Sequence, residues 1–329
     1  MKKHEVIKVE NLTKYFKIKK GFLSNFSKSK QEYIYAVNNI SFSIGEKEIL
    51  GFIGESGCGK STMSRSILRL IEPSSGTISF KGEDILALNS KDLRKYRRKM
   101  QMIFQDPFGS LNPRRTVADT LRQTVKIHKL AETIDEEDKL IKEAMEEVEL
   151  IPVEEYWDKY PALLSGGQQQ RVSMGRVIIL KPEFVIADEP VSMLDVSVRI
   201  GVLKLILKMK EKHNISFIYI THDLSTARYV CDRIAIMYLG KIVEIGPTEE
   251  ILANPVHPYT QALIKAVPDI DPTVKVKEIP IKGYVPVVPG EGVNCSFYPR
   301  CPYADEQCNN EMPTMKKVGD EHFVACFKR

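Results

Sequence analysis

The sequence lacks any long apolar run. Although 43% of its 329 residues are hydrophobic, no stretch approaches the roughly 18 uninterrupted apolar residues that a membrane helix requires. Any role at a membrane would therefore depend on partner proteins. The first residues include Lys2 and Lys3 but no apolar segment and no small-residue cleavage site. They do not indicate a secretory signal, and we expect a cytosolic protein.

An excess of charge of one sign is also missing. The chain has 48 basic and 43 acidic residues, a net charge of +5, and the two signs alternate along most of its length. Nucleic acid is therefore not indicated as a partner. The densest basic cluster, at 91–99, is better explained as a solvated helix face. No internal repeat or low-complexity tract is present, and the length suits one large domain with a smaller addition.

The chain alternates between apolar strands and helical segments. Strands are predicted at 48–53, 184–187 and 216–220. The first runs into a glycine-rich loop, and the other two are each followed by polar residues, as in buried parallel strands with chemistry at their carboxyl ends. Residues from about 105 to 164 show helical periodicity. Because 11 of the 18 prolines lie from Pro247 onward, we place a boundary near Asn254. Beyond it we expect an irregular extension with short helices, held by something other than a large core.

The glycine-rich loop after the first of these strands fits a phosphate-binding pattern. Its glycines let backbone amides curl around phosphate oxygens, Lys60 adds a positive charge near the β- and γ-phosphates, and the Ser61 hydroxyl can bind Mg²⁺. A helix predicted to start at Ser61 would point the positive end of its dipole at the same anion. The residues expected to contact the nucleotide here are Gly54, Ser56, Gly57, Cys58, Gly59, Lys60, Ser61 and Thr62.

Two carboxylates follow the strand at 184–187. Asp188 would hold Mg²⁺ directly or through water, and Glu189 stands one residue further on, where it can polarise an attacking water. An Asp-Glu pair at a strand end is common by itself. The phosphate-binding loop upstream is what favours the catalytic interpretation.

A second glycine pair marks a predicted helix start. Ser165, Gly166, Gly167 and Gln168 follow Leu164, and a serine with two flexible glycines at a helix start can bind phosphate. The same residues also suit an ordinary capped helix. The glycine-rich loop at 54–61, the P-loop, would hold the single γ-phosphate bound by its own chain. We therefore expect the second phosphate-binding site to contact the nucleotide of another subunit in a dimer.

Over about residues 5–250, these motifs and their order along the chain resemble those of the nucleotide-binding subunits of ABC transporters. The resemblance implies an α/β fold: a P-loop NTPase (RecA-like) core with an antiparallel β subdomain, within a domain at 1–253. A helical subdomain is expected at about 105–165, and a cysteine-containing extension at 254–329. ATP and Mg²⁺ are the implied cofactors. The family's head-to-tail dimer would hold two ATP molecules, each between the P-loop of one subunit and the signature motif of the other.

The resemblance also assigns individual roles. Phe16, or Tyr15 beside it, would stack on adenine, and His222 would be the switch histidine. Residues 165–168 correspond to the signature motif. The residues expected to carry catalysis are Glu189, His222 and Gln105, and those expected to hold Mg²⁺ are Ser61, Gln105 and Asp188.

Within the family, the chain is similar to the F-type subunit of oligopeptide and dipeptide importers. Three features carry this: the insertion at 17–35, the run at 188–197, and an ending in which His-Pro-Tyr at 257–259 is followed by a cysteine-containing segment at 295–302. Import of peptides is implied. Nickel and some oligosaccharides, which related systems serve, remain alternatives.

Four of the six cysteines lie near the C-terminus, spaced C-x5-C-x6-C-x17-C: Cys295, Cys301, Cys308 and Cys326. A cytosolic location argues against a disulfide framework. Four thiolates in a proline-rich tail can instead ligate a [4Fe-4S] cluster, which is our expectation. Zinc is the next candidate, although the C-x2-C knuckles of structural zinc sites are absent. Four unligated thiols are the third possibility.

The implied partners are other transporter subunits. They are a second ATPase subunit in a heterodimer, with a homodimer as the alternative, two transmembrane permease subunits, and indirectly an extracytoplasmic substrate-binding protein. The chain would lie at the cytoplasmic face of the membrane as a peripheral subunit. A soluble ABC ATPase is expected to show a long coiled coil or two tandem cassettes, and neither is present. A non-catalytic subunit is expected to lose Lys60, Glu189 or His222, and all three are intact.

Overall fold

A computed structural model describes residues 4–18, 32–266, 281 and 290–328 of the chain. Its elements belong to two compact units, which are described in turn. The first unit comprises Met1–Val6, Ile44–Ile49 and Ala87–Ile220, and the second comprises Ile7–Ser43, Leu50–Leu86 and Thr221–Arg329.

Neighbouring parallel strands form the core of the first unit, in the order β8, β7, β6. They are β6 (Met100–Ile103), β7 (Phe184–Asp188) and β8 (Ser216–Thr221). All residues of β7 and β8 are buried, which explains their unbroken apolar sequences. Because Met100 pairs with Phe184 and Phe184 with Ser216, the strands end at one edge, where the predicted catalytic carboxylates follow.

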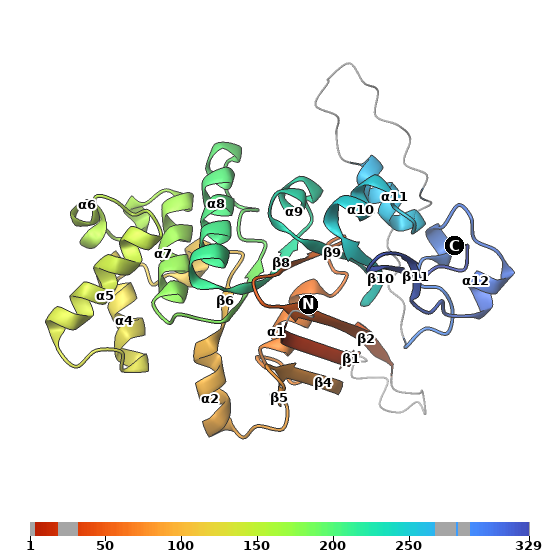
Figure 1. Ribbon diagram of the computed structural model, residues 1–329, viewed down its shortest axis with the longest axis horizontal. Helices are drawn as coiled ribbons and strands as arrows, with labels where there is room; N and C mark the ends of the chain where they lie inside the picture. The colour runs from red at the N-terminus through yellow and green to blue at the C-terminus, as the bar shows by residue number, and fades with distance from the viewer. Residues whose placement is uncertain (1–3, 19–31, 267–280, 282–289, 329) are drawn as a thin grey trace, which may run out of the picture. The chain divides into compact units, whose positions relative to one another are not determined.

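Helices make up most of the rest of the first unit (Figure 1). They are α2 (Ser90–Lys99), α3 (Pro107–Ser110), α4 (Val117–His128), α5 (Ile134–Glu147), α6 (Val153–Trp157), η2 (Pro161–Leu163), α7 (Gly166–Ile178) and α8 (Val196–His213). Helices α3 to η2 lie in the stretch, from about residue 105 to 164, whose sequence shows helical periodicity. A capping box of Thr133 and Glu136 starts α5, whose acidic first turn complements the helix dipole. In α2 only Leu93 is buried, so the basic cluster is a solvated helix face.

An antiparallel sheet opens the second unit, in the order β2, β1, β4, β5. Its strands are β1 (Glu5–Lys17), β2 (Tyr33–Gly45), β4 (Ser75–Phe80) and β5 (Glu83–Asp84). Ile7 pairs with Phe80 and Val9 with Ile78, and all four side chains are buried. These cross-strand apolar pairs fix the register of the sheet.

A second set of strands in this unit carries the P-loop. β3 (Ile49–Ile53) runs parallel to β9 (Arg233–Tyr238), which forms an antiparallel hairpin with β10 (Lys241–Pro247). The unit also contains α1 (Lys60–Ile67), α9 (Leu224–Val230), α10 (Thr248–Ala253) and α11 (Pro258–Lys265). The predicted order of strand, loop and helix around residues 54–61 is therefore confirmed by β3 and α1.

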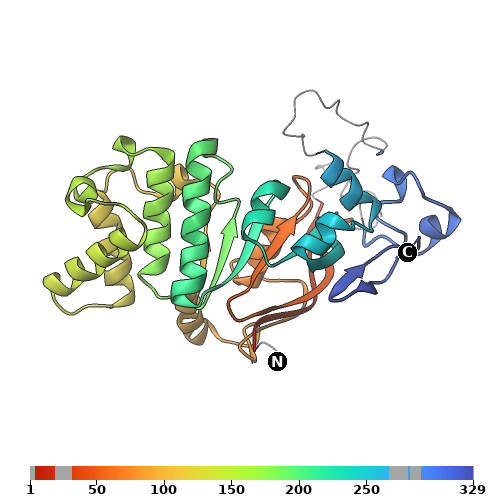
Figure 2. The same cartoon turned by 45° about the horizontal axis from the view of Figure 1, so that its top comes forward.

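The cysteine-containing end of the chain joins the same sheet. After η3 (Tyr298–Arg300) and α12 (Glu306–Asn310), a hairpin of β11 (Lys316–Gly319) and β12 (His322–Val324) pairs with β10, where Glu244 faces Val324. The buried side chains of Glu244 and His322 meet at 2.8 Å. This segment, drawn in blue, lies beside β10 in Figure 1, and Figure 2 shows the same blue segment from a second direction. The short helices were expected, whereas the added strand was not.

Across the described ranges, no helix combines the length and apolar character needed to cross a membrane.

Candidate functional site

The P-loop is built by the end of β3 and the start of α1. β3 is buried along its whole length. The P-loop begins after this strand, at Gly54, and leads into helix α1, which starts at Lys60. The buried Lys60 ammonium donates to the carbonyl oxygens of Gly54, at 2.6 Å, and Glu55, at 3.1 Å. A loop of amides with a lysine charge across it is suited to phosphate, and the positive end of α1 adds to this.

Two glycines of the P-loop are required by close backbone approaches. A Cβ atom on Gly59, whose φ is +106°, would lie 1.9 Å from the carbonyl oxygen of Ala36. A Cβ atom on Gly54 would lie 2.2 Å from the carbonyl oxygen of Met237. Neither carbonyl can move without disturbing its strand, so any side chain at these positions would deform the loop.

Cys58 contributes a small buried side chain to the P-loop. Burial raises the pKa of its thiol, although the nearby Lys60 charge acts in the opposite direction. Its Sγ atom lies 3.6 Å from Lys60 Nζ. The neutral thiol therefore leaves the lysine charge available for an anion.

A cavity of about 560 Å³ borders the P-loop. Ser56 and Gly57 line it on the P-loop side, and Tyr35 lies on the β2 side. Asn294 and Pro299, from the C-terminal extension, belong to the same lining. Sequence reasoning did not place any extension residue beside the P-loop.

The aromatic residues near the end of β1 differ in their packing. The Tyr15 ring lies 5.0 Å from the Tyr33 ring and 5.3 Å from the Tyr35 ring. Phe16 is 43% exposed, with the Lys14 ammonium 5.1 Å from its ring centre. Phe16 thus has a face available for a base, while Tyr15 is partly engaged, and adenine stacking on Phe16 stays a prediction. His222, which follows β8, is exposed.

In the first unit the structure brings Gln105 and Glu189 together. Gln105 Nε2 donates to Glu189 Oε2 at 2.9 Å, because β6 and β7 are adjacent parallel strands whose carboxyl ends coincide. Glu189 has a φ of +46°, and its N–H donates to the Ile220 carbonyl at 2.9 Å. Asp188, the last residue of β7, is 5% exposed. A buried aspartate followed by a carboxylate in an uncommon backbone conformation is typical of a functional strand end.

The signature residues start helix α7. Ser165 Oγ accepts from the Gln168 N–H at 3.3 Å, and Gln168 Oε1 accepts from the Ser165 N–H at 2.9 Å. These two hydrogen bonds form a capping box, so the ordinary cap is present. Ser165 is nevertheless exposed, and a Cβ atom on Gly167 would lie 2.2 Å from Val198 Cγ1. Phosphate binding across a dimer stays a prediction.

A backbone hydrogen bond joins two of the four C-terminal cysteines. The Cys295 N–H donates to the Cys308 carbonyl at 3.0 Å. Burial, and then the charges of Cys308, Cys301 and Cys326, raise the pKa of the Cys295 thiol to about 11. Among the described residues, however, no group of three or more His, Cys, Asp or Glu side chains is arranged to hold a metal ion. No metal-ion site is therefore found at these cysteines among the described residues, and the expected [4Fe-4S] cluster stays a prediction.

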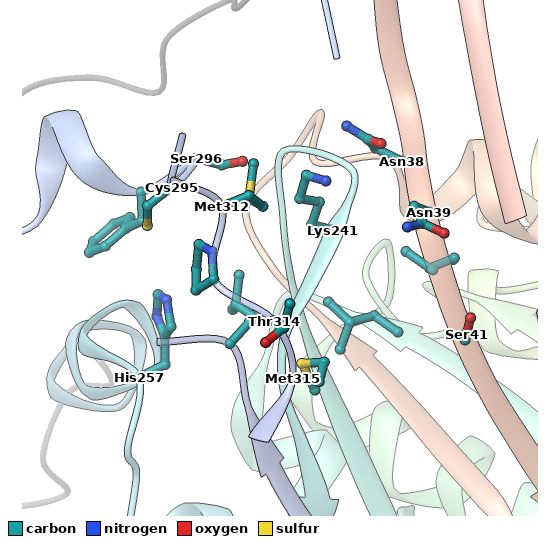
Figure 3. Close-up of a pocket in the computed structure, with 16 residues that line it drawn as sticks. Asn38, Asn39, Ser41, Lys241, His257, Cys295, Ser296, Met312, Thr314 and Met315 are labelled. Atoms are coloured by element: carbon teal, nitrogen blue, oxygen red, sulfur yellow. The ribbon is translucent and has the colours of Figure 1, made fainter. Parts of the chain in front are cut away.

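A second cavity, of about 300 Å³, lies beside Cys295 (Figure 3). Asn38 and Ser41 of β2, Lys241 of β10 and Met312 belong to its lining, with Cys295 at one end. Burial lowers the pKa of the Lys241 ammonium, against the opposing charge of Glu291. Of the predicted site residues, only Cys295 lines this cavity, which therefore lies apart from the phosphate-binding loop.

Comparison with known proteins places these features in a family. Residues 37–192 match the model of the ABC transporter family, and residues 243–308 match a model described as the oligopeptide/dipeptide transporter C-terminal region. The oligopeptide transport ATP-binding protein AppF of Bacillus subtilis is 41% identical over 324 residues, covering 98% of this chain and 96% of AppF.

Solved structures agree with this placement. The dimeric ATP-binding cassette MJ0796, bound to ADP and Pi, matches with a TM-score of 0.63 and 29% identity, over 74% of this chain and 98% of the cassette. A second match is cbiO1 of Clostridium perfringens, part of the transporter complex cbiONQ, with a TM-score of 0.63 and 27% identity. It covers 76% of this chain and 92% of cbiO1. The predicted fold class is confirmed.

Proposed function

The chain belongs to the ATP-binding subunits of ABC transporters, and we propose that it powers an importer for oligopeptides or dipeptides. ATP hydrolysis is the activity of this family, with ATP and Mg²⁺ as its cofactors. The observation that carries the cargo class is the C-terminal match at residues 243–308, together with the peptide cargo in the name of AppF. The P-loop fits the nucleotide, because its amides and Lys60 surround a position suited to phosphate.

We propose that the motif residues act in ATP hydrolysis as the family pattern implies. Glu189 is the general base, supported by its hydrogen bond from Gln105, which places an amide beside the carboxylate. The residues proposed to contact ATP are Phe16, Gly54, Ser56, Gly57, Cys58, Gly59, Lys60, Ser61, Thr62 and, from the signature motif, Ser165, Gly166, Gly167 and Gln168. Mg²⁺ is assigned to Ser61, Gln105 and Asp188, and the switch role to His222.

The proposed assembly is a transporter at the cytoplasmic face of a membrane. It contains a second, different ATPase subunit and two permease subunits, and it receives cargo from an extracytoplasmic binding protein. The dimeric state of the matched cassette supports pairing of two ATPase subunits.

Cargo is tested by uptake into vesicles that contain the chain, its permease subunits and its second ATPase subunit. We expect ATP-dependent uptake of radiolabelled oligopeptides or dipeptides and none of Ni²⁺ or an oligosaccharide. Vesicles carrying Glu189→Gln serve as the matched control without hydrolysis. Uptake of nickel or an oligosaccharide instead would change the cargo assigned to the importer. ATP hydrolysis without association with any permease would contradict the transporter role.

We also propose that residues 254–329 form a separate functional extension from the ATPase domain at 1–253, and that its cysteines hold a [4Fe-4S] cluster. Support comes from the spacing of the four cysteines and from the Cys295 N–H, which donates to the Cys308 carbonyl at 3.0 Å. A cluster would supply the cation charge that four neighbouring thiolates require. Anaerobically purified protein should then be brown and contain about four iron atoms per chain. Colourless, iron-free protein with full activity would exclude the cluster. Zinc found in such protein would identify the cysteines as a zinc site instead.

A further inference from the structure

Arg300, in the cysteine-containing extension, forms a bidentate ion pair with Glu55 of the P-loop. Nη1 lies 2.9 Å from Glu55 Oε2, and Nη2 lies 3.2 Å from Oε1. The Arg300 side chain is 8% exposed and that of Glu55 30%. Parallel hydrogen bonds between a guanidinium and a carboxylate fix orientation as well as distance. This pair therefore holds the Glu55 side chain in one position.

A carboxylate inside a phosphate-binding loop needs such a partner. Glu55 follows Gly54 directly and belongs to the segment whose amides and Lys60 provide positive potential. An unpaired negative charge there would repel a triphosphate, and the repulsion is stronger in a partly buried site than in bulk water. Arg300 cancels this charge and keeps the carboxylate bound to the extension.

The backbone of Glu55 is held by the same part of the fold. Its N–H donates to Tyr259 Oη at 2.9 Å. The Tyr259 ring is buried against those of Tyr238 and Phe297, with centroid distances of 4.8 and 5.5 Å. The Arg300 guanidinium lies over the Tyr238 ring at 5.8 Å. The backbone of Glu55 directly, and its side chain through Arg300, therefore both contact one aromatic cluster, which is formed by β9 and by two parts of the extension, α11 and the segment with Phe297.

The turn that carries Arg300 is tied to the cysteines. Tyr298 N–H donates to the Cys295 carbonyl at 2.9 Å, and the Cys301 N–H to the Phe297 carbonyl at 3.0 Å. Cys295 is in turn bonded through its N–H to Cys308. The position of the guanidinium thus follows the conformation of the cysteine segment.

We propose that Arg300 is a positioning residue for ATP binding, which acts through Glu55 to keep the P-loop receptive to phosphate. The extension is the scaffold that presents it. The proposal rests on the ATP-binding role of the P-loop and is independent of the transported cargo.

The test compares MgATP binding and hydrolysis by the full chain and its variants. Arg300→Met leaves the Glu55 charge uncompensated, so the Kd and KM for MgATP should rise roughly tenfold, or ~1.4 kcal/mol, with kcat changed by less than about twofold. Because the effect is electrostatic, the ratio of variant to wild-type Kd should shrink between about 0.05 and 0.5 M KCl. Adding Glu55→Gln to Arg300→Met should restore most of the affinity.

Arg228→Met is the matched control. Arg228 pairs with Glu249 at 3.0 Å, but both side chains are more than 60% exposed and lie outside the P-loop, so its Kd for MgATP should equal that of wild type. If Arg300→Met does not fold, Arg300→Lys takes its place. Its Kd for MgATP should rise roughly threefold, and adding Glu55→Gln should reverse this rise. Wild-type affinity in the single variant, or a double variant as weak as the single, would overturn the proposal. Loss of peptide uptake with intact MgATP binding would instead concern the proposed transport function.

Discussion

We expect His257 to make the folded protein sensitive to mild acid. Its ring is 2% exposed, and Nδ1 accepts the Tyr259 N–H at 3.0 Å, which caps the start of α11. A protonated ring could not accept this bond. Burial lowers the pKa of His257 to about 3. The charged neighbour is Glu244, whose carboxylate accepts the His257 backbone N–H at 3.0 Å and also meets His322.

The size of the effect follows from proton linkage. An unfolded histidine has a pKa of about 6.5 and takes up a proton below that pH, whereas folded His257 stays neutral down to about pH 3. Stability contributed by this residue is therefore complete above pH 6.5 and is lost as the pH falls toward 3. At pH 5 the loss is about 2 kcal/mol, and any folded pKa below about 4 gives the same figure.

The assay is urea unfolding at pH 7 and pH 5, followed by circular dichroism, for wild type and His257→Asn. Asparagine can still accept the Tyr259 N–H but binds no proton, so the variant should lose about 2 kcal/mol less between the two pH values. His4→Asn, at an exposed position, is the control and should keep the wild-type pH dependence. An equal loss in wild type and His257→Asn would refute the assignment of His257 as a buried neutral acceptor.

Two further predictions concern the catalytic carboxylate and the attachment of the extension. Glu189→Gln should bind MgATP like wild type but lower kcat by roughly 10²–10⁴, the range for a lost general base, in a phosphate-release assay; near-normal kcat would assign the base elsewhere. Glu244→Gln should cost about 2–3 kcal/mol in urea unfolding, because the buried carboxylate accepts from the Val256 N–H and the His257 N–H and also meets His322. Limited proteolysis should then release the β11–β12 hairpin sooner, and an unchanged cleavage rate would show that this carboxylate does not hold the hairpin.

The P-loop shows what consecutive residues determine. The spacing of Gly54, Gly59, Lys60 and Ser61 between a predicted strand and a predicted helix indicates a phosphate cradle, which needs glycines at fixed positions. The structure supplies the reason for two of them, in the carbonyls that approach Gly54 and Gly59. The buried strands around Asp188 can also be predicted from the sequence, since an apolar run before polar residues is a local pattern.

The attachment of the extension shows where local patterns stop. The hairpin of β11 and β12 has strands of four and three residues, too short for a reliable alternation of apolar and polar residues. Its pairing with β10 depends on Glu244 and His322, which are 78 positions apart. The sequence predicted an irregular extension held by something other than a large core, but not the strand to which the extension attaches.

The sequence by itself therefore determined the nucleotide-binding motifs, the succession of strands and helices, and the family they indicate. Each of these depends on residues close together in the chain, whose spacing directly reflects backbone geometry. Only the tertiary structure decided that Arg300 compensates Glu55, that Tyr259 holds the Glu55 backbone, and that Gln105 reaches Glu189. These contacts join residues 84 to 245 positions apart. The local sequence around either residue does not indicate its partner, because the path of the whole chain brings the two together.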